Sequence, residues 1–340
     1  MSLWFLILLP LIGAACTIPA RASYAKWIAL VVSTIVLIVS ILMSVQYAWG
    51  TAEYGLLSDV QWFSFFEISL DLGVDSVALL LVLLTTLLTP LCVWGSFSAI
   101  TSRRREYYAW LLILEAAMIG VFTAQDLILF YVSFELTLLP MFFLIAIYGG
   151  SNRAYASVKF FIYTFTGSLF ALAGFIYVAW QSQVDSGSWS FSIETLTSFA
   201  ANNLNSTEQA WVLLALLSGF AVKIPVFPVH TWLPLAHTEA PTAGSVILAG
   251  VLLKLGTFGV YRFVIPMVPI ALVEYAPMIA VLAIIGILYA ALICWVQDDI
   301  KKLVAYSSIS HLGFCVLGLL AMNPIGLEGA VLYMLNHGLS

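Results

Sequence analysis

The chain has 340 residues, of which 63% are hydrophobic and 9% are charged, and its formal net charge is −5 at pH 7. Soluble domains average about 25% charged residues and at most about half apolar residues. The composition therefore excludes an ordinary water-soluble domain and predicts an all-α, polytopic transmembrane helical bundle. The four cysteines lie far apart without a metal-ligand spacing, and no Walker or GxGxxG loop occurs, so we expect no metal or nucleotide site.

Eleven apolar runs have the length of a membrane span, because a helix needs about 20 apolar residues to cross the hydrocarbon. They lie near 2–20, 27–48, 74–98, 107–124, 127–149, 156–181, 209–229, 242–266, 275–296 and 302–322, with an eleventh from Pro324. No basic stretch precedes the first run, so it reads as a span and not as a cleaved signal peptide. The last run is still continuing at Ser340, so we expect a fragment of a longer protein.

Charge in the short loops predicts the orientation. Eight of the 12 basic residues lie in alternate loops: Arg21, Lys26, Arg103, Arg104, Arg105, Arg153, Lys301 and Lys302. The intervening loops carry acids: Glu53, Asp59, Glu67, Asp71, Asp185, Glu194 and Glu208. The excess of Lys and Arg marks the cytoplasmic side. We expect an inner (cytoplasmic) membrane protein with its N-terminus outside.

A few ionisable residues fall inside the runs, where a charge costs between about 2.5 and over 10 kcal/mol. They are Glu115, Glu135, Lys223, Lys254, His311 and His337, with His230 and His237 just beyond Lys223. Such groups must pair or line a wet cavity. Asp75, Asp126 and Lys159 lie near span ends, where snorkelling to water is the favoured reading.

Glu135 and Lys223 have opposite signs and similar depth, which predicts an ion pair. The structural alternative is a bridge that only holds two helices together, although buried pairs add little net stability. The functional alternative is a proton switch. Burial favours the neutral lysine and a nearby carboxylate favours the ammonium, so drawing the carboxylate away would release the proton.

Prolines after Lys223 predict a discontinuous helix. Pro225 and Pro228 remove backbone donors and clash with carbonyls one turn earlier, so the helix must break near 225–234, where Pro234 also lies. Broken helices at membrane depth are where transporters place ion sites. His230 would share a face with Lys223 on an unbroken helix, so the segment reads as half of a proton path.

Two further residues extend the candidate relay. Lys254 has no acid in its own run and lies between Gly250 and Gly256, which indicates a packed, inward-facing position and favours a relay role. His311 is surrounded by serines, and a relay histidine and a satisfied core histidine are equally compatible with that setting.

Three stretches carry a family resemblance: FYVSFELTLLPMFFLIAIYGG (130–150), LPLAHTEAPTAGSVILAGVLLKLGTFG (233–259) and DDIKKLVAYSSISHLGF (298–314). They resemble the antiporter-like subunits of respiratory complex I, the NADH-quinone oxidoreductase chain M type above all. The resemblance implies that Glu135, Lys223 and Lys254 match the family's glutamate and lysines, and that His230 and His237 match its histidines at and after the broken helix.

The resemblance also implies domain boundaries. Residues 1–106 would form three N-terminal helices, 107–266 the first of two inverted five-helix repeats, and 267–340 the start of a second, truncated repeat. Two positions depart from the family pattern. Leu235 stands where the family usually has Asp, which puts the proton inlet in question, and Asp75-Ser76 replaces Asp-Gly at a helix start.

The resemblance implies a non-redox, proton-translocating subunit of NADH:quinone oxidoreductase. NADH, FMN, iron–sulfur clusters and quinone would bind other subunits, and the partners would be sister membrane chains and lipid, with no nucleic acid; in a eukaryote the membrane would be the mitochondrial inner membrane. Two alternatives remain. One is a subunit of a multisubunit Na+/H+ antiporter or membrane-bound hydrogenase, and the other is a scaffold with inert buried charges.

Overall fold

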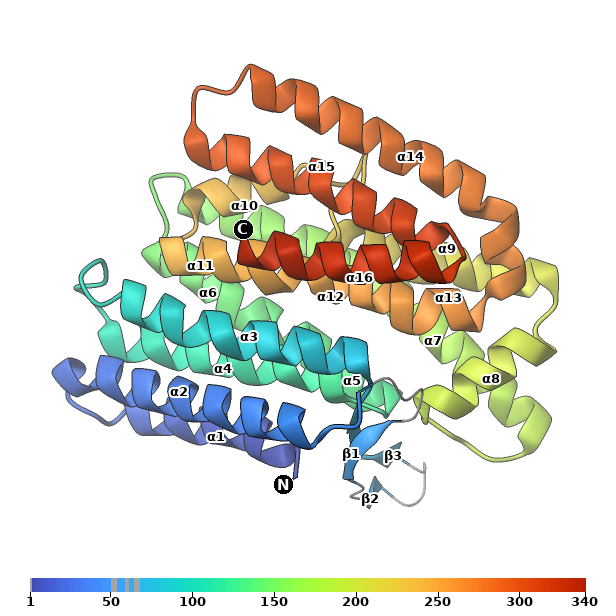
Figure 1. Ribbon diagram of the computed structural model, residues 1–340, viewed down its shortest axis with the longest axis horizontal. Helices are drawn as coiled ribbons and strands as arrows, with labels where there is room; N and C mark the ends of the chain where they lie inside the picture. The colour runs from blue at the N-terminus through green and yellow to red at the C-terminus, as the bar shows by residue number, and fades with distance from the viewer. Residues whose placement is uncertain (1, 50–53, 59–60, 64–67) are drawn as a thin grey trace.

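The computed structural model describes residues 2–49, 54–58, 61–63 and 68–340. Three of the acids used to predict the orientation, Glu53, Asp59 and Glu67, lie outside the described residues. The remaining chain is a bundle of long helices that run roughly along one direction (Figure 1).

The helices fall into three groups along the chain. The first is α1 (Trp4–Thr17), α2 (Ala22–Gln46), α3 (Ser76–Gly95), α4 (Arg104–Thr123), α5 (Leu127–Leu136) and α6 (Leu138–Tyr148). The second is α7 (Arg153–Ser186), α8 (Ile193–Asn203), α9 (Ser206–Lys223), α10 (Leu233–Glu239), α11 (Thr242–Ile247), η1 (Leu248–Leu252), α12 (Leu253–Gly259), η2 (Val260–Val264) and α13 (Ile265–Met267). The third is α14 (Pro269–Trp295), α15 (Ile300–Leu320) and α16 (Pro324–Leu339).

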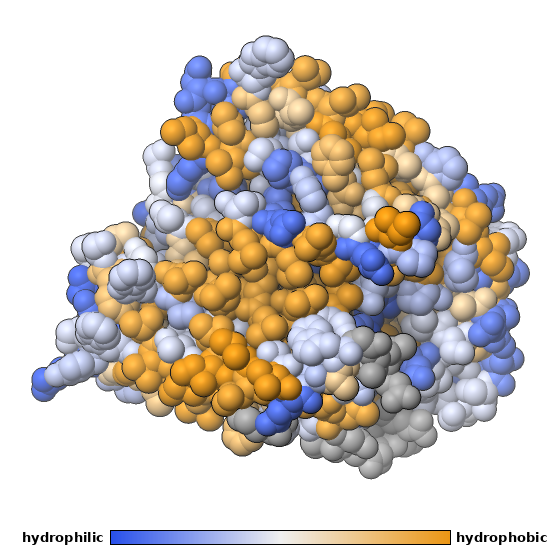
Figure 2. Space-filling model, in the orientation of Figure 1, coloured by the Kyte–Doolittle hydropathy of each residue, from blue (hydrophilic) through white to orange (hydrophobic). Residues whose placement is uncertain are grey.

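Eight helices of the described chain are long and apolar enough to cross a membrane. Apolar side chains cover much of the face seen in Figure 2. Burial within the bundle separates central from peripheral helices. The stretch Thr242–Met267 has 89% of its most apolar window buried, whereas Pro269–Trp295 has only 22% buried. The first is a core helix, and the second leaves most of its surface to lipid or to another protein.

Eight of the eleven predicted spans match these helices with local differences. The runs at 2–20, 209–229 and from Pro324 form α1, α9 and α16, which are not among the eight. The run at 2–20 forms a helix of only 14 residues, α1. The run at 127–149 is two helices that meet at Thr137, because Pro140 has no N–H to offer the carbonyl of Leu136. The run at 156–181 belongs to a helix of 34 residues, α7.

The prediction of an all-α chain misses two small sheets between α2 and α3. Strand β1 (Gly55–Ser58) pairs antiparallel with β4 (Leu72–Val74), and β2 (Gln61–Phe63) pairs with β3 (Ile68–Ser69). They cap one end of the bundle, opposite the α1–α2 and α3–α4 loops (Figure 1). Their short strands leave the fold class unchanged.

Candidate functional site

The helix break lies directly after Lys223, as the prolines predict. Pro225 cannot donate to the carbonyl of Ala221, and the N–H of Val226 reaches it instead, at 2.9 Å. The indole Nε1 of Trp232 donates to the carbonyl oxygen of Val222 at 2.9 Å. Backbone groups that the break would leave unpaired at membrane depth therefore have protein partners. Pro234 is not part of the break, because it occupies the first turn of α10, where proline is tolerated.

Lys223, the last residue of α9, is buried with 3% of its surface exposed. Its Nζ donates to the hydroxyl of Thr137 at 3.3 Å and lies 4.7 Å from the centre of the Phe134 ring. Thr137 is the residue between α5 and α6, so the interruption of that span places a hydroxyl next to the ammonium. The cation thus has a hydroxyl and a ring face as neighbours.

The predicted ion pair between Glu135 and Lys223 is wrong for this conformation. Within the described part of the chain, no nitrogen–oxygen contact of 4.0 Å or less joins them, because Thr137 and Phe134 occupy the ammonium. The Oε1 atom of Glu135 is buried without a hydrogen-bond partner among the described residues. The carboxylate still interacts electrostatically with Lys223 and lies near the hydroxyls of Ser168 and Tyr131. The two charges are neighbours without direct contact.

Lys254 is fully buried and has two direct partners. Its Nζ donates to the carbonyl oxygen of Ala249 at 2.6 Å and lies 2.6 Å from Nδ1 of His337. Ala249 belongs to the π-helical turn η1, which changes the backbone pairing just before Lys254. This lysine is therefore bound between its own helix and α16.

Close packing at Gly256 brings α12 against the end of α9. A Cβ at this position would lie 2.6 Å from Cγ1 and 2.9 Å from the backbone N of Ile224, the residue after Lys223. Only glycine permits this approach of helix to backbone. The helices that carry Lys223 and Lys254 thus pack together, although no hydrogen bond joins the two lysines in the described chain.

His311 lies next to His337, with ring centroids 5.7 Å apart, and next to Tyr333, at 5.9 Å. It is exposed in the chain as described, which does not match a satisfied core histidine. The geometry places Lys254, His337 and His311 in one row from the bundle interior to its surface.

His230 and His237 are both buried, and the Nδ1 atom of each is without a hydrogen-bond partner among the described residues. Lys223 and His230 do not share a helix face, because α9 ends at Lys223, as the prolines predict. The His230 ring instead stacks on Phe227 and meets Tyr289 of α14, at 5.7 and 5.6 Å between centroids. His237 lies on α10, one turn from its start.

Of the other ionisable residues near or inside the predicted spans, three have structural contacts, and a fourth, Glu115, has no partner among the described residues that explains its burial. Asp75 caps α3 and pairs with Arg262 at 3.0 Å, so it does not snorkel to water. Asp126 accepts N–H bonds at the start of α5, and Lys159 lies over the rings of Tyr155 and Tyr163. Glu115 is fully buried, and neither carboxylate oxygen has a partner in the described chain.

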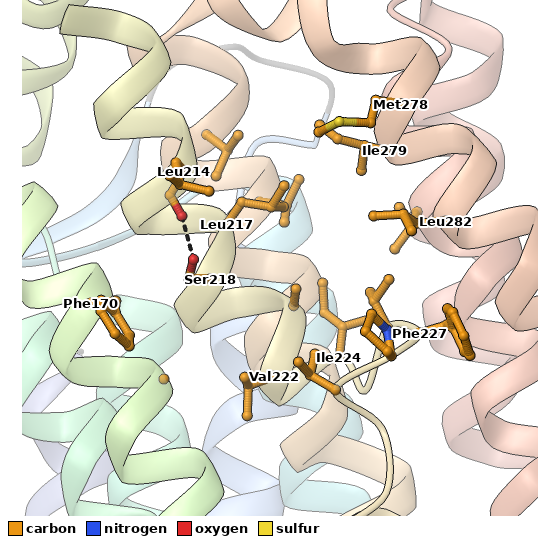
Figure 3. A pocket seen from close by; sticks show the side chains of 18 of the residues that line it. Phe170, Leu214, Leu217, Ser218, Val222, Ile224, Phe227, Met278, Ile279 and Leu282 are labelled. Atoms are coloured by element: carbon orange, nitrogen blue, oxygen red, sulfur yellow. Dashed lines mark hydrogen bonds between the residues drawn. The ribbon is translucent and has the colours of Figure 1, made fainter.

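A cavity of about 580 Å³ opens beside the break, between α7, α9 and α14 (Figure 3). Its labelled lining is apolar apart from Ser218, whose hydroxyl donates to the carbonyl of Leu214 at 2.6 Å. The neighbours of Lys223 in sequence, Val222 and Ile224, line it, but the lysine itself does not. Tyr163 and Thr166 add two further hydroxyls to the lining, but no Lys, His, Asp or Glu side chain is among the described lining residues, so the cavity is separate from the candidate relay.

The sequence missed several partners. Thr137 and Ala249 cannot be recognised from the sequence as partners of the two lysines, because a hydroxyl and a backbone carbonyl occur throughout the chain. Both become partners through local interruptions of their helices. The sequence shows His337 as an ionisable residue in the last run, but its contact with Lys254 depends on how α16 packs. Among the described residues, no three His, Cys, Asp or Glu side chains are arranged to hold a metal ion.

The fold and this site define a class, the polytopic helical membrane proteins whose core holds ionisable side chains around a discontinuous helix. The chain belongs to the NADH:quinone oxidoreductase/Mrp antiporter transmembrane family, whose profile matches residues 124–340. It is a multi-pass membrane protein.

Relatives and a solved structure agree with this assignment. The chain is 40% identical over 338 residues to the NADH-ubiquinone oxidoreductase chain 4 of Marchantia polymorpha, covering 98% of this chain and 66% of that one. It is 40% identical over 324 residues to the NADH-quinone oxidoreductase subunit M of Rhodobacter capsulatus, covering 94% and 63%. A chain of respiratory complex I from Thermus thermophilus superposes with a TM-score of 0.87 at 27% identity, covering 99% and 68%. The chain spans slightly less than two thirds of the length of these two curated relatives.

Proposed function

We propose that the chain is a non-redox, proton-translocating membrane subunit of NADH:quinone oxidoreductase. The observation that carries this proposal is the contact of the fully buried Lys254 with the half-buried His337 at 2.6 Å. A lysine bound to a neutral imidazole nitrogen is a donor–acceptor pair ready to pass a proton. The relatives are named as subunits of NADH-quinone and NADH-ubiquinone oxidoreductases, and from these names we infer the redox reaction that would drive the proton transfer.

In this proposal, Lys223 and Glu135 form the first switch. The present conformation has Lys223 on Thr137 and Glu135 apart from it. Movement of the carboxylate onto the ammonium would favour the charged lysine, and its withdrawal would favour proton release. His230 and His237 would deliver protons to this pair, and Lys254, His337 and His311 would carry them onward.

The proposal extends to the surroundings of the chain. Residues 107–266 form the first repeat and 267–340 belong to the second, with the N-terminus outside. Other subunits bind NADH, FMN, iron–sulfur clusters and quinone. Energy from quinone reduction would reach this chain through neighbouring membrane subunits, sister antiporter-like chains among them.

The second candidate is a subunit of an Mrp-type sodium/proton antiporter, because the matched family includes both kinds of complex. NADH-driven proton uptake into inverted membrane vesicles distinguishes them, with NADH oxidation followed in the same sample. Glu135→Ala in the native complex should abolish both activities. Glu274→Ala, which removes an exposed carboxylate on α14, is the matched control and should change neither. Unchanged pumping and oxidation in Glu135→Ala would contradict the proposal, and sodium-gradient-driven exchange would then be measured.

A further inference from the structure

Three loops at one end of the bundle gather half of the basic residues of the chain. They connect α1 to α2, α3 to α4 and α6 to α7, and they lie at the same end of the molecule (Figure 1). Six of the 12 Lys and Arg residues lie in or beside them: Arg21, Lys26, Arg103, Arg104, Arg105 and Arg153. We call this set the basic face.

Direct contacts join the three loops into one surface. Arg105 Nη1 donates to the carbonyl oxygen of Ile18 at 3.4 Å, which ties α4 to the α1–α2 loop. The Tyr148 hydroxyl donates to the carbonyl oxygen of Arg103 at 2.9 Å, which ties in the α6–α7 loop. The charges therefore act together and not as three separate loops.

Most of the positive charge of this surface is not neutralised. Arg103 pairs with Glu106, an exposed contact. Arg104 and Arg153 each donate to a backbone carbonyl, at 2.9 and 3.1 Å, and so does Arg105. A carbonyl holds a guanidinium in place without cancelling its charge, and several N–H donors remain on each one. Held arginines with donors to spare suit planar, bidentate recognition of phosphate.

Aromatic side chains around the basic face set its depth in the membrane. Tyr24, Trp27, Trp94 and Tyr155 are 57%, 53%, 65% and 57% exposed. Exposed Trp and Tyr on a membrane protein mark the level of the lipid headgroups. The Lys26 ammonium lies 4.8 Å from the centre of the Phe97 ring, which itself meets Trp27 edge-on at 5.2 Å. Charge and aromatic rings are thus built into the same surface.

We propose that the basic face binds the phosphate groups of anionic phospholipids. Clustered Lys and Arg next to membrane helices attract anionic lipid, and each contributes about a fivefold change in affinity. The headgroup level favours lipid over a soluble acidic protein as the partner. This inference does not depend on the proposed function.

The test is native mass spectrometry of the full chain in detergent, titrated with phosphatidylglycerol or phosphatidylcholine of identical acyl chains. The wild type should bind phosphatidylglycerol at least about 25-fold more tightly than phosphatidylcholine, because two of the six basic residues alone account for that factor. Arg21→Gln/Arg105→Gln should weaken that binding about 25-fold and leave phosphatidylcholine unchanged. Lys159→Gln/Lys302→Gln removes the same charge near the same end of the bundle but outside the three loops, and it should weaken phosphatidylglycerol binding clearly less than Arg21→Gln/Arg105→Gln does.

Equal affinity of the wild type for the two lipids would overturn the proposal. An acidic protein surface would then be the partner to test for the basic face. An equal loss of phosphatidylglycerol affinity in the control double variant would also overturn the proposal, because binding would then depend on total charge and not on the basic face. Inorganic phosphate should not displace the lipid; displacement would show that the site takes a free anion. The thermal stability of both double variants, measured in the same detergent, separates loss of binding from loss of fold.

Discussion

Nζ of Lys254 lies 2.6 Å from Nδ1 of His337, a residue 83 positions further along the chain. A charged lysine donates hydrogen bonds and accepts none, so Nδ1 is the acceptor and the neutral ring carries its proton on Nε2. The same ammonium donates to the carbonyl oxygen of Ala249, also at 2.6 Å. The contact joins the core helix to α16 and makes proton transfer between the two side chains geometrically direct.

Replacing His337 with alanine should therefore interrupt the relay. Lys254 would keep only the carbonyl of Ala249, which cannot take up a proton. NADH-driven proton uptake by the complex should fall on the order of 100-fold, the usual contribution of a positioned proton-transfer group. His337→Gln offers a hydrogen-bond acceptor without a titratable ring and should not restore uptake. Full uptake in His337→Gln would show that the contact is structural.

Thr137→Val tests whether the hydrogen bond to Lys223 contributes to the proposed switch between Lys223 and Glu135. The substitution keeps the shape of the side chain but removes the hydroxyl that Lys223 contacts at 3.3 Å. Leaving a buried ammonium without such a partner lowers the free energy of unfolding by about 1–3 kcal/mol, unless the ammonium turns to another acceptor. We expect a lower thermal stability together with slower proton uptake. Thr137→Ser keeps the hydroxyl and should behave as wild type; equal defects in both variants would mean that packing, not the hydrogen bond, is affected.

The class of the fold and the ends of most helices could be predicted from the sequence, because apolar runs and prolines act locally. Pro225 and Pro228 placed the break of α9, and Pro140 explains the interruption at Thr137 in retrospect. The basic loops fall at one end of the bundle, as predicted. These features depend on residues near one another in the sequence.

The side-chain contacts could not be predicted, because they depend on how separate helices are rotated. Glu135 and Lys223 have similar depth, yet Thr137 and Phe134 stand at the ammonium instead. Asp75 looked like a residue that reaches water, but Arg262 comes to it from 187 positions away. The depth of a residue in the membrane can be counted along its helix, whereas the rotation of that helix about its axis is set by packing against other helices.

The Arg262–Asp75 pair should behave as a coupled unit. Arg262 is almost fully buried and also donates to Gln125 Oε1 at 3.2 Å. Arg262→Met leaves the aspartate without its counter-charge and should cost about 3 kcal/mol of unfolding free energy. Adding Asp75→Asn should recover part of that loss, because the orphaned charge disappears. A thermal-denaturation double-mutant cycle measures the coupling, and strictly additive losses would contradict it. The exposed pair Arg103–Glu106 is the control and should show no measurable coupling.

Gly149→Ala should loosen α10, the short helix that carries His237. The carbonyl oxygen of Glu239 accepts the N–H of Gly150 at 2.9 Å, and its carboxylate accepts the N–H of Asn152 at 2.9 Å. These bonds fix the end of α10 to the α6–α7 loop. A Cβ on Gly149 would clash with the carbonyl oxygen of Ile145 and lie 2.9 Å from that of Glu239, two backbone atoms that cannot rotate away.

The loop must therefore shift both at the end of α6 and against α10, at a cost of about 1–3 kcal/mol. Thermal denaturation should show the loss, and proton uptake should fall with it if His237 delivers protons. Gly95→Ala is the matched control, because a Cβ there meets no atom within 4 Å. If the two substitutions lowered stability equally, the contact with Glu239 would not be what holds α10. If only stability fell and uptake per folded complex stayed constant, His237 would lie outside the proton path.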